Sequence, residues 1–277
     1  MKDSPACRQA GPLLRSLGMT AMGTMSNIIT IAKNTFKETI RDRILYGILA
    51  FALLFLMSTV LFGSISLGED VKVVKDFGLA GIYIFSIIIT IFLGTSLIYK
   101  EIEKRTLYII FSKPVSVTQF IIGKFLGLMA SIKLTVILMT IAYLLIVYFK
   151  GGGIDWLSLW SIILLLFELA IFVALTILFS TFTAPLAGTI YSIIILYIGH
   201  SLGLVHQYGI KAGGISKYLS DFIYYLLPNL EKFNLRNSVV HGIAPRPLEI
   251  VYPVVYAIFY TAILLYLAIV SLKKQDL

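Results

Sequence analysis

Residues 156–179 read WLSLWSIILLLFELAIFVALTILF, and the only charged side chain among them is Glu168. Crossing the hydrocarbon core of a bilayer, about 30 Å thick, takes about 20 mostly apolar residues. This segment is therefore predicted to be a transmembrane helix, and five other segments meet the same requirement. The six predicted spans are Ile44–Gly63, Phe77–Ile98, Phe125–Phe149, Trp156–Phe179, Ala184–Val205 and Ile250–Leu272.

The overall composition agrees with a membrane protein. Hydrophobic residues make up 58% of the chain and charged residues only 13%, whereas soluble domains carry roughly 25% charged residues. Six such helices in a soluble protein would leave too little polar chain to cover them. The net charge of +9 comes from basic residues between the apolar runs, which argues against a nucleic-acid partner. The single Cys7 excludes a disulfide framework and a cysteine-rich metal site.

The positions of Lys and Arg predict the orientation of the chain. With the N-terminus inside, fourteen of these residues fall in segments that face the cytoplasm and eight in segments that face outside. Because short cytoplasmic loops carry an excess of Lys and Arg, both termini are predicted to lie in the cytoplasm.

The region before the first span divides into two parts. Residues 1–26 contain several Gly and Pro residues and are expected to be a disordered extension, and Met25 is a candidate for the true start codon. Residues 27–43 are predicted to form an amphipathic interfacial helix along the inner leaflet. Its apolar stripe is Ile29, Ala32, Phe36 and Ile40, and its basic stripe is Lys33, Lys37 and Arg41. A generic basic membrane anchor is the alternative.

Residues 99–124, between the second and third spans, are predicted to form a cytoplasmic elbow of two short helices. Pro114 ends the first helix at or before Lys113, and Ser116 with Gln119 forms a capping box that starts the second. Gly123 and Lys124 would mark re-entry into the membrane. The charged residues expected to face water are Glu101, Glu103, Lys104 and Arg105. An ordinary solvated loop is the alternative.

Three ionisable residues fall within the spans, namely Lys133, Glu168 and His200. Such groups are costly in lipid and are treated as functional candidates. Lys133 and Glu168 lie at comparable depths, so an ion pair between them is one hypothesis. The alternatives are that Lys133 reaches the inner surface and that Glu168 stays protonated. For His200, a hydrogen bond to the backbone is favoured over a place on a translocation path.

The outer segment 206–249 contains a second amphipathic stretch. Residues Ser216 to Leu227 carry apolar side chains at helical spacing before Pro228. This stretch is predicted to be a short helix that either dips back between the fifth and sixth spans or lies on the outer leaflet.

No phosphate-binding Gly-x-x-x-x-Gly-Lys-Ser/Thr motif is present in the sequence, and no hydrolytic triad, zinc helix or paired-Asp signature. The chain is therefore predicted not to be an enzyme and not to hydrolyse ATP. No internal repeat of the kind seen in many secondary transporters is evident either.

Five motifs resemble the ABC-2-type transporter permeases, and especially the branch that includes the permease of nitrous-oxide-reductase copper maturation. They are the run Glu101–Thr106, the turn Ser112–Ser116, Gly123–Lys124, the segment Ser180–Pro185 and Gly199–His200. The resemblance extends from about Asn27 to the C-terminus. Val117 departs from it, since many relatives have Arg there.

The resemblance implies a coupling helix in the elbow that docks on an ATPase subunit, with the N-terminal helix as its neighbour. The residues that it assigns to coupling are Glu101, Glu103, Lys104, Arg105, Thr106, Ser112, Pro114, Ser116 and Gln119. It further implies that ATP and Mg bind a separate chain and that this chain binds no cofactor or metal itself. A second permease copy, a bacterial or archaeal plasma membrane and export are also expected. A membrane scaffold or assembly factor without transport activity remains the alternative, and a secondary transporter is a third possibility.

Overall fold

The computed structural model describes residues 25–65, 69–103, 115–153 and 155–274. The regular elements in these ranges are all helical, and six of the helices are long and apolar enough to cross a membrane. The predicted all-α fold with six spans is therefore confirmed. The six are α2 (Arg43–Ile65), α3 (Asp70–Leu97), α6 (Val117–Val147), α7 (Trp156–Phe182), α8 (Pro185–Ala212) and α11 (Pro247–Lys273). The shorter elements are a helix over residues 25–40, α4 (Tyr99–Glu103), the π-helical turn η1 (Tyr148–Gly152), α9 (Gly214–Leu226), the 3₁₀ turn η2 (Glu231–Phe233) and α10 (Arg236–Val240).

Several helices are longer than the spans predicted for them. α3 begins at Asp70 rather than Phe77, α6 begins at Val117 rather than Phe125, and α8 continues to Ala212. At 1.5 Å per residue the 28 residues of α3 are roughly 42 Å long, which exceeds the thickness of the hydrocarbon core. Hydropathy marks only the part of a helix that lipid covers, whereas backbone hydrogen bonding continues through the polar turns beyond it.

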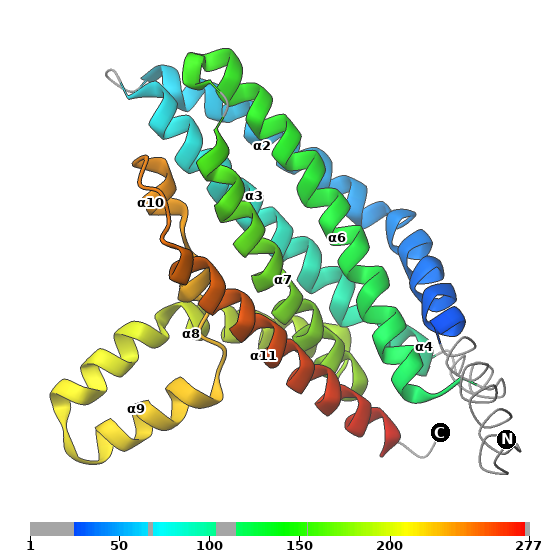
Figure 1. The fold of residues 1–277 in the computed structure, drawn as a ribbon. Coiled ribbons are helices and arrows are strands. Elements are labelled where there is room, and N and C mark those ends of the chain that lie inside the picture. The colour runs from blue at the N-terminus through cyan, green and yellow to red at the C-terminus, as the bar shows by residue number, and fades with distance from the viewer. Residues whose placement is uncertain (1–24, 66–68, 104–114, 154, 275–277) are drawn as a thin grey trace, which may run out of the picture.

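α3 and α7 are the central helices of the bundle. In their most apolar stretches 61% and 67% of the residues are buried, against 22% in α2, α8 and α11. Figure 1 shows α2, α3, α6, α7 and α11 running along one another, while α8 and α9 form a hairpin that projects from this bundle. The outer helices therefore present large apolar faces that are suited to lipid or to another protein.

A glycine allows α3 and α7 to pack closely. A Cβ built on Gly94 would lie 2.7 Å from the Cβ of Thr176 in α7, which is closer than real Cβ atoms approach one another. In membranes, where apolar burial between helices gives little driving force, small residues at helix crossings allow the backbone contact that stabilises the bundle. Gly94 is thus needed for the packing of the two central helices.

The helix over residues 25–40 runs beside the first turns of α6. Gly123 of α6 meets Ile31, Gly127 meets the carbonyl of Ala32, and Asn27 Nδ2 donates to Gln119 Oε1 at 3.5 Å. Figure 1 places the start of this helix at the same end of the bundle as α4 and the last turn of α11. We call this the termini end, and we call the end that carries η1 and α10 the distal end.

A buried carboxylate ties three helices together at the distal end. Asp155, which caps α7, lies 3.1 Å from Lys75 Nζ of α3. It also accepts a hydrogen bond from Tyr143 of α6 at 3.1 Å and others from Ser158 of α7. Burial acts to raise the pKa of Asp155, but the hydrogen bonds from Ser158 and Lys75 outweigh burial, so that this pKa is lower than usual. The cluster fixes the spacing of α3, α6 and α7.

The segment between α8 and α11 contains the predicted helix and then returns to the bundle. α9 ends at Leu226, just before Pro228, and packs along the second half of α8. His206 Nε2 of α8 lies 2.9 Å from Asp221 Oδ1 of α9. After α9 the chain forms η2 and α10, which contact α7 and α3. Residues 231–240 therefore cover the distal part of the bundle, whereas α9 stays with α8.

Candidate functional site

A buried lysine joins three elements at the termini end. Lys124 of α6 is only 4% exposed, and its Nζ lies 2.6 Å from Glu101 Oε1 of α4. The same Nζ lies 3.7 Å from Glu38 Oε2 of the helix over residues 25–40 and 5.8 Å from the centre of the Phe120 ring. A buried ammonium needs paired charges and hydrogen bonds. Lys124 therefore holds α4, α6 and the N-terminal helix together.

A serine connects this unit to the central helix α7. Ser180, near the end of α7, is buried, and its hydroxyl oxygen accepts hydrogen bonds from the backbone N–H groups of Ile98 and Tyr99 at 2.9 and 3.0 Å. These two donors lie at the break between α3 and α4. Ser180 therefore ties α4 to α7, and Lys124 ties α4 to α6.

The orientation predicted for Glu101 is wrong. Its side chain is 19% exposed and turns inward to Lys124, because the buried ammonium requires a carboxylate close to it. Glu103 is exposed, as predicted. The other elbow residues assigned to coupling lie outside the described residues, so their placement stays a prediction. They are Lys104, Arg105, Thr106, Ser112 and Pro114.

The predicted capping box is present, but the helix that it starts differs from the prediction. Gln119 N donates to Ser116 Oγ at 3.2 Å, and Ser116 N donates to Gln119 Oε1 at 3.2 Å. The capped helix is α6 itself, which continues without a break to Val147, so a separate second elbow helix is a wrong prediction. Gly123 lies inside α6. Its lack of a side chain allows the N-terminal helix to approach closely at Ile31.

The basic side chains of the N-terminal helix point away from the protein. Lys33, Lys37 and Arg41 are exposed and Phe36 is partly buried. Ile29, which was placed on the apolar stripe, is 63% exposed, and the side that packs on the bundle includes the buried Thr35 and Thr39 instead. A lipid-facing role for the exposed side remains a prediction.

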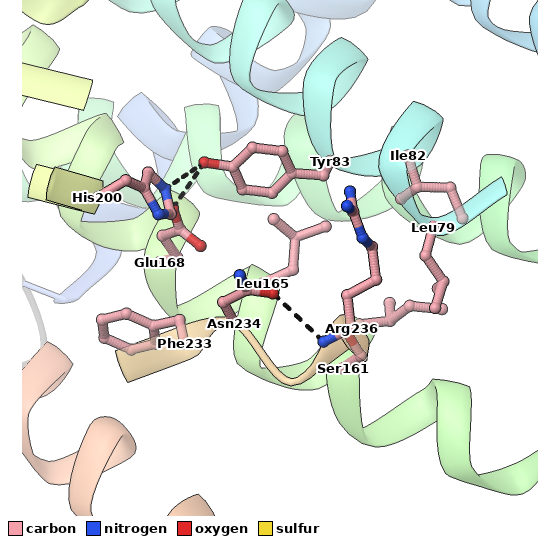
Figure 2. Close-up of a pocket in the computed structure, with 11 residues that line it drawn as sticks. Leu79, Ile82, Tyr83, Ser161, Leu165, Glu168, His200, Phe233, Asn234 and Arg236 are labelled. Atoms are coloured by element: carbon pink, nitrogen blue, oxygen red, sulfur yellow. Dashed lines mark hydrogen bonds and ion pairs between the residues drawn. The ribbon is translucent and has the colours of Figure 1, made fainter. Parts of the chain in front are cut away.

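A second polar site lies in the distal half of the bundle, at a cavity of about 160 Å³ between α3, α7, α8 and residues 233–236. Figure 2 shows Tyr83, Glu168 and His200 converging on one side of this cavity and Arg236 standing on the other. Glu168 is 2% exposed. Its Oε1 accepts from Tyr83 at 3.2 Å and lies 3.1 Å from His200 Nε2.

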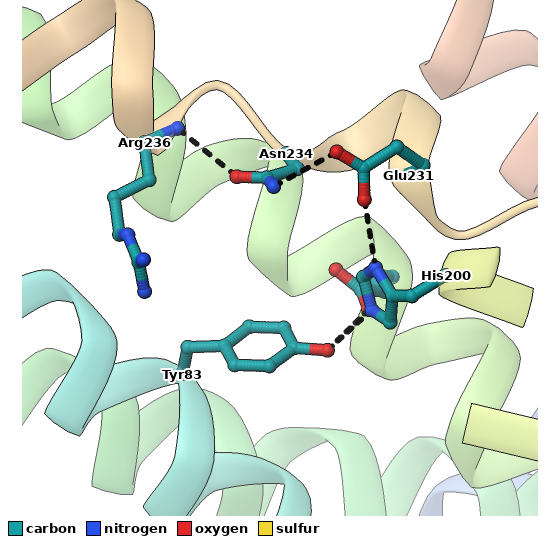
Figure 3. A network of polar contacts seen from close by, with 6 residues as sticks. Tyr83, His200, Glu231, Asn234 and Arg236 are labelled. Carbon is teal, nitrogen blue, oxygen red and sulfur yellow. Dashed lines mark hydrogen bonds and ion pairs between the residues drawn. The ribbon is translucent and has the colours of Figure 1, made fainter. Parts of the chain in front are cut away.

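His200 bridges two carboxylates, as Figure 3 illustrates for its contact with Glu231. Its Nδ1 lies 3.1 Å from Glu231 Oε2 of η2, while its Nε2 faces Glu168. The prediction of a backbone hydrogen bond for His200 is wrong. The reason is that a carboxylate from a neighbouring helix and another from η2, 31 residues along the chain, both reach its ring.

The predicted ion pair between Lys133 and Glu168 is also wrong. Lys133 is exposed, whereas its neighbours Ser131 and Ile132 are buried, so the lysine points away from the interior of the bundle. Comparable depth was the basis of the prediction. Two side chains on neighbouring helices can meet only if each lies on the face of its helix that points into the bundle. Lys133 lies on the opposite face of α6.

The cover of the distal cavity is held by its own contacts. Arg236 Nε lies 3.0 Å from Asp76 Oδ1 of α3, and Asn234 Nδ2 donates to Glu231 Oε1 at 3.1 Å. Lys232 Nζ lies 4.8–5.8 Å from the ring centres of three tyrosines. Those are Tyr224, Tyr252 and Tyr256. Cation–π contact thus holds η2 beside α9 and α11, and the ion pair of Arg236 holds α10 beside α3.

Sequence reasoning missed Tyr83, Glu231 and Arg236 at the distal cavity. Tyr83 reads as one more aromatic residue in an apolar span, and no local pattern distinguishes it. Glu231 and Arg236 lie in the connection between α9 and α11, where charged residues are ordinary. The available signal was Glu168, because a carboxylate in the middle of a span must find donors, and a tyrosine on a neighbouring helix is a natural one.

A family model described as "ABC-2 family transporter protein" matches residues 29–277 of this chain. The match includes all six spans, the elbow and residues 231–240, which cover the distal cavity. The comparison with curated proteins finds no significant match. The specific branch associated with copper maturation of nitrous-oxide reductase therefore remains a prediction, and the residues of both polar sites have to be interpreted from their geometry.

Proposed function

Because the chain belongs to the ABC-2 family of transporter proteins, we propose that it is a permease subunit driven by an ATPase on a separate chain. Six helices that can cross a membrane and the family match over residues 29–277 support the permease subunit.

The coupling surface of this proposal is the termini end. The observation that carries it is the burial of Lys124 between Glu101 and Glu38. If the elbow were a loosely attached loop, a closing ATPase dimer would move the loop without moving the spans. Lys124 pairs with α4 and faces the N-terminal helix, so we expect α4, α6 and the N-terminal helix to move together. Glu103 of α4 is exposed and available to contact the ATPase.

The proposed route from the elbow to the transport pathway runs along α7. Ser180 holds the start of α4, and Glu168 lies on the same helix at the distal cavity. The two residues are separated by roughly 18 Å of helix at 1.5 Å per residue. A rigid shift of α7 would therefore move one wall of the cavity whenever α4 moves.

We further propose a pair of permease chains in the plasma membrane of a bacterium or archaeon, with the termini in the cytoplasm. The large exposed apolar faces of α2, α8 and α11 support contact with a second copy as well as with lipid. The excess of Lys and Arg in the segments at the termini end supports the orientation. The resemblance to ABC-2 permeases favours export.

Site-specific cross-linking tests the coupling proposal. Cys7 is first replaced by Ser, and Glu103→Cys is introduced on the exposed side of α4. The protein is co-expressed with an ATP-binding-cassette subunit from the same genome and labelled with a benzophenone maleimide, which on irradiation cross-links to nearby residues without a cysteine on the ATPase. Cross-linking to the ATPase is expected, with a yield that changes when ATP and vanadate are added.

The matched control is His241→Cys, which places an exposed cysteine just after α10 at the distal end and should give no cross-link to the ATPase. A cross-link from position 103 that is unaffected by nucleotide would favour a scaffold without transport. Absence of any cross-link from position 103 in a co-purifying complex would refute the coupling surface.

A further inference from the structure

The distal cavity has the features of a ligand-binding site rather than of a packing defect. It has a volume of about 160 Å³, and a buried carboxylate, an imidazole, a phenol and a guanidinium reach it. Packing defects in protein interiors are apolar, whereas binding sites combine an apolar lining with a few convergent polar groups. The apolar part of this lining comes from Leu79, Ile82, Ile162, Leu165 and Phe233.

His200 lies between two carboxyl groups and beside a phenol. Nε2 lies 2.5 Å from the Tyr83 hydroxyl oxygen and 3.1 Å from Glu168 Oε1, and Nδ1 lies 3.1 Å from Glu231 Oε2. Each contact between a ring nitrogen and a carboxyl group needs a proton. One solution is an imidazolium between two carboxylates. The other is a neutral imidazole between one carboxylate and one carboxylic acid. With Glu168 ionised, the group carries one negative charge in both.

The remaining charge at the cavity is already compensated. Arg236, which lines the opposite side, lies 3.0 Å from Asp76, and together these two groups are neutral. Among the described residues that line the cavity, the other charged groups are Glu168 and His200. With Glu168 ionised, Glu168, His200 and Glu231 together therefore carry one negative charge that no other described residue lining the cavity compensates.

One oxygen of Glu168 is free to receive a ligand. Oε1 takes the contacts with Tyr83 and His200, and none of the described residues donates to Oε2. Figure 2 shows this second oxygen directed away from His200, toward Leu165 and Asn234. The Glu168 side chain is 2% exposed, and a donor inside the cavity would complete the hydrogen bonding of this oxygen.

We propose that this cavity binds a small organic ammonium ion, with its charged group against Glu168 and its apolar part against Leu79, Ile82 and Leu165. Tyr83 and Phe233 add aromatic rings of the kind that attract organic cations. A cavity of about 150 Å³ accommodates a benzene ring, so ligands of this size fit. An inorganic cation is disfavoured, because within the described residues no group of three or more His, Cys, Asp or Glu is arranged to hold a metal ion.

The binding of such an ion can be tested without the proposed permease function. The further idea that the ion is the transported substrate rests on that function. The permease alone, purified in detergent without ATPase or ATP, is titrated with benzylammonium chloride, sodium benzoate or benzyl alcohol at constant ionic strength. Thermal unfolding is recorded at each concentration. Benzylammonium is expected to raise the midpoint in a saturable way, and the anion and the neutral alcohol are expected to leave it unchanged.

Two variants test the location of the site. Glu168→Gln removes the charge at nearly constant volume and should raise the benzylammonium Kd at least tenfold. Ser161→Phe fills the cavity from α7 without removing a charged group and should abolish binding, which keeps the test valid even if the first variant folds poorly. Glu103→Gln, at the termini end, is the matched control and should bind like the wild type.

Equal stabilisation by benzoate, no stabilisation by any of the three compounds, or a Glu168→Gln variant that binds within twofold of the wild type would each overturn the proposal. None of these outcomes depends on an ATPase partner. A failed cross-link at position 103 would therefore refute the coupling proposal and leave the binding site untouched, and the reverse also holds.

Discussion

The pair formed by Lys124 and Glu101 offers the sharpest test of how the termini end is held together. Glu101→Gln leaves the ammonium of Lys124, only 4% exposed, without its partner at 2.6 Å. Breaking a buried pair from one side costs about 3–5 kcal/mol. Glu38, at 3.7 Å from Lys124 Nζ, still pairs with the ammonium in part, so we expect the free energy of unfolding to fall by about 3 kcal/mol. Lys124→Met should cost about 2 kcal/mol, because the remaining carboxyl group can become protonated.

The double variant with Glu101→Gln and Lys124→Met places an apolar chain beside a neutral amide and removes both charges together. We expect it to cost about 3 kcal/mol in total instead of the sum of about 5, a coupling energy of about 2 kcal/mol, within the range for residues in direct contact. Glu38→Gln should cost less than about 1 kcal/mol, since its side chain is 61% exposed and solvent screens the interaction.

The free energies come from unfolding in mixed micelles with increasing SDS, followed by circular dichroism. Each of the four proteins in the cycle is measured under identical conditions, and Glu103→Gln serves as the control for an exposed carboxylate of the same helix. A coupling energy below about 0.5 kcal/mol would refute the reasoning, because the elbow would then be attached without the buried pair.

Four further outcomes are expected. The stability provided by Asp155 is present at neutral pH and is lost as pH falls through its lowered pKa, so acid titration of unfolding should show a loss that Asp155→Asn lacks. Ser116→Ala removes an N-cap and should cost about 1 kcal/mol in the same SDS assay. Gly94→Val drives a side chain into Thr176 and should lower the yield of folded protein on gel filtration, with a cost of about 1–3 kcal/mol or more. Lys133→Ala should change stability by less than about 0.5 kcal/mol, because the lysine is exposed.

Features that depend on neighbouring residues in the sequence could be predicted. The six spans follow from length and hydropathy, and the start of α6 follows from the Ser116 and Gln119 pattern, because a capping box needs only residues three positions apart. The end of α9 before Pro228 was predictable for the same reason. In each case the energy that decides the structure is local or comes from the surrounding lipid.

Features that depend on the direction of a side chain around its helix could not be predicted. Depth in the membrane suggested Lys133 as the partner of Glu168, but the packing of helices decides which residues point inward. Glu101 turned inward for the same kind of reason, because Lys124 on another helix is buried. The contact of Glu231 with His200 depends on how the segment between α8 and α11 returns to the bundle, and no local sequence pattern predicts that return.

The most direct test of the whole account is whether ATP hydrolysis at the termini end changes the distal cavity. Ser161→Cys in a Cys7→Ser background, reconstituted in liposomes with the ATPase subunit, is labelled with a membrane-impermeant maleimide before and after trapping with ATP and vanadate. The labelling rate at position 161 is expected to change severalfold on trapping, and Lys124→Met should abolish this change while nucleotide binding persists. An identical labelling rate in the two states would contradict the claim that the chain transmits movement from an ATPase to this cavity.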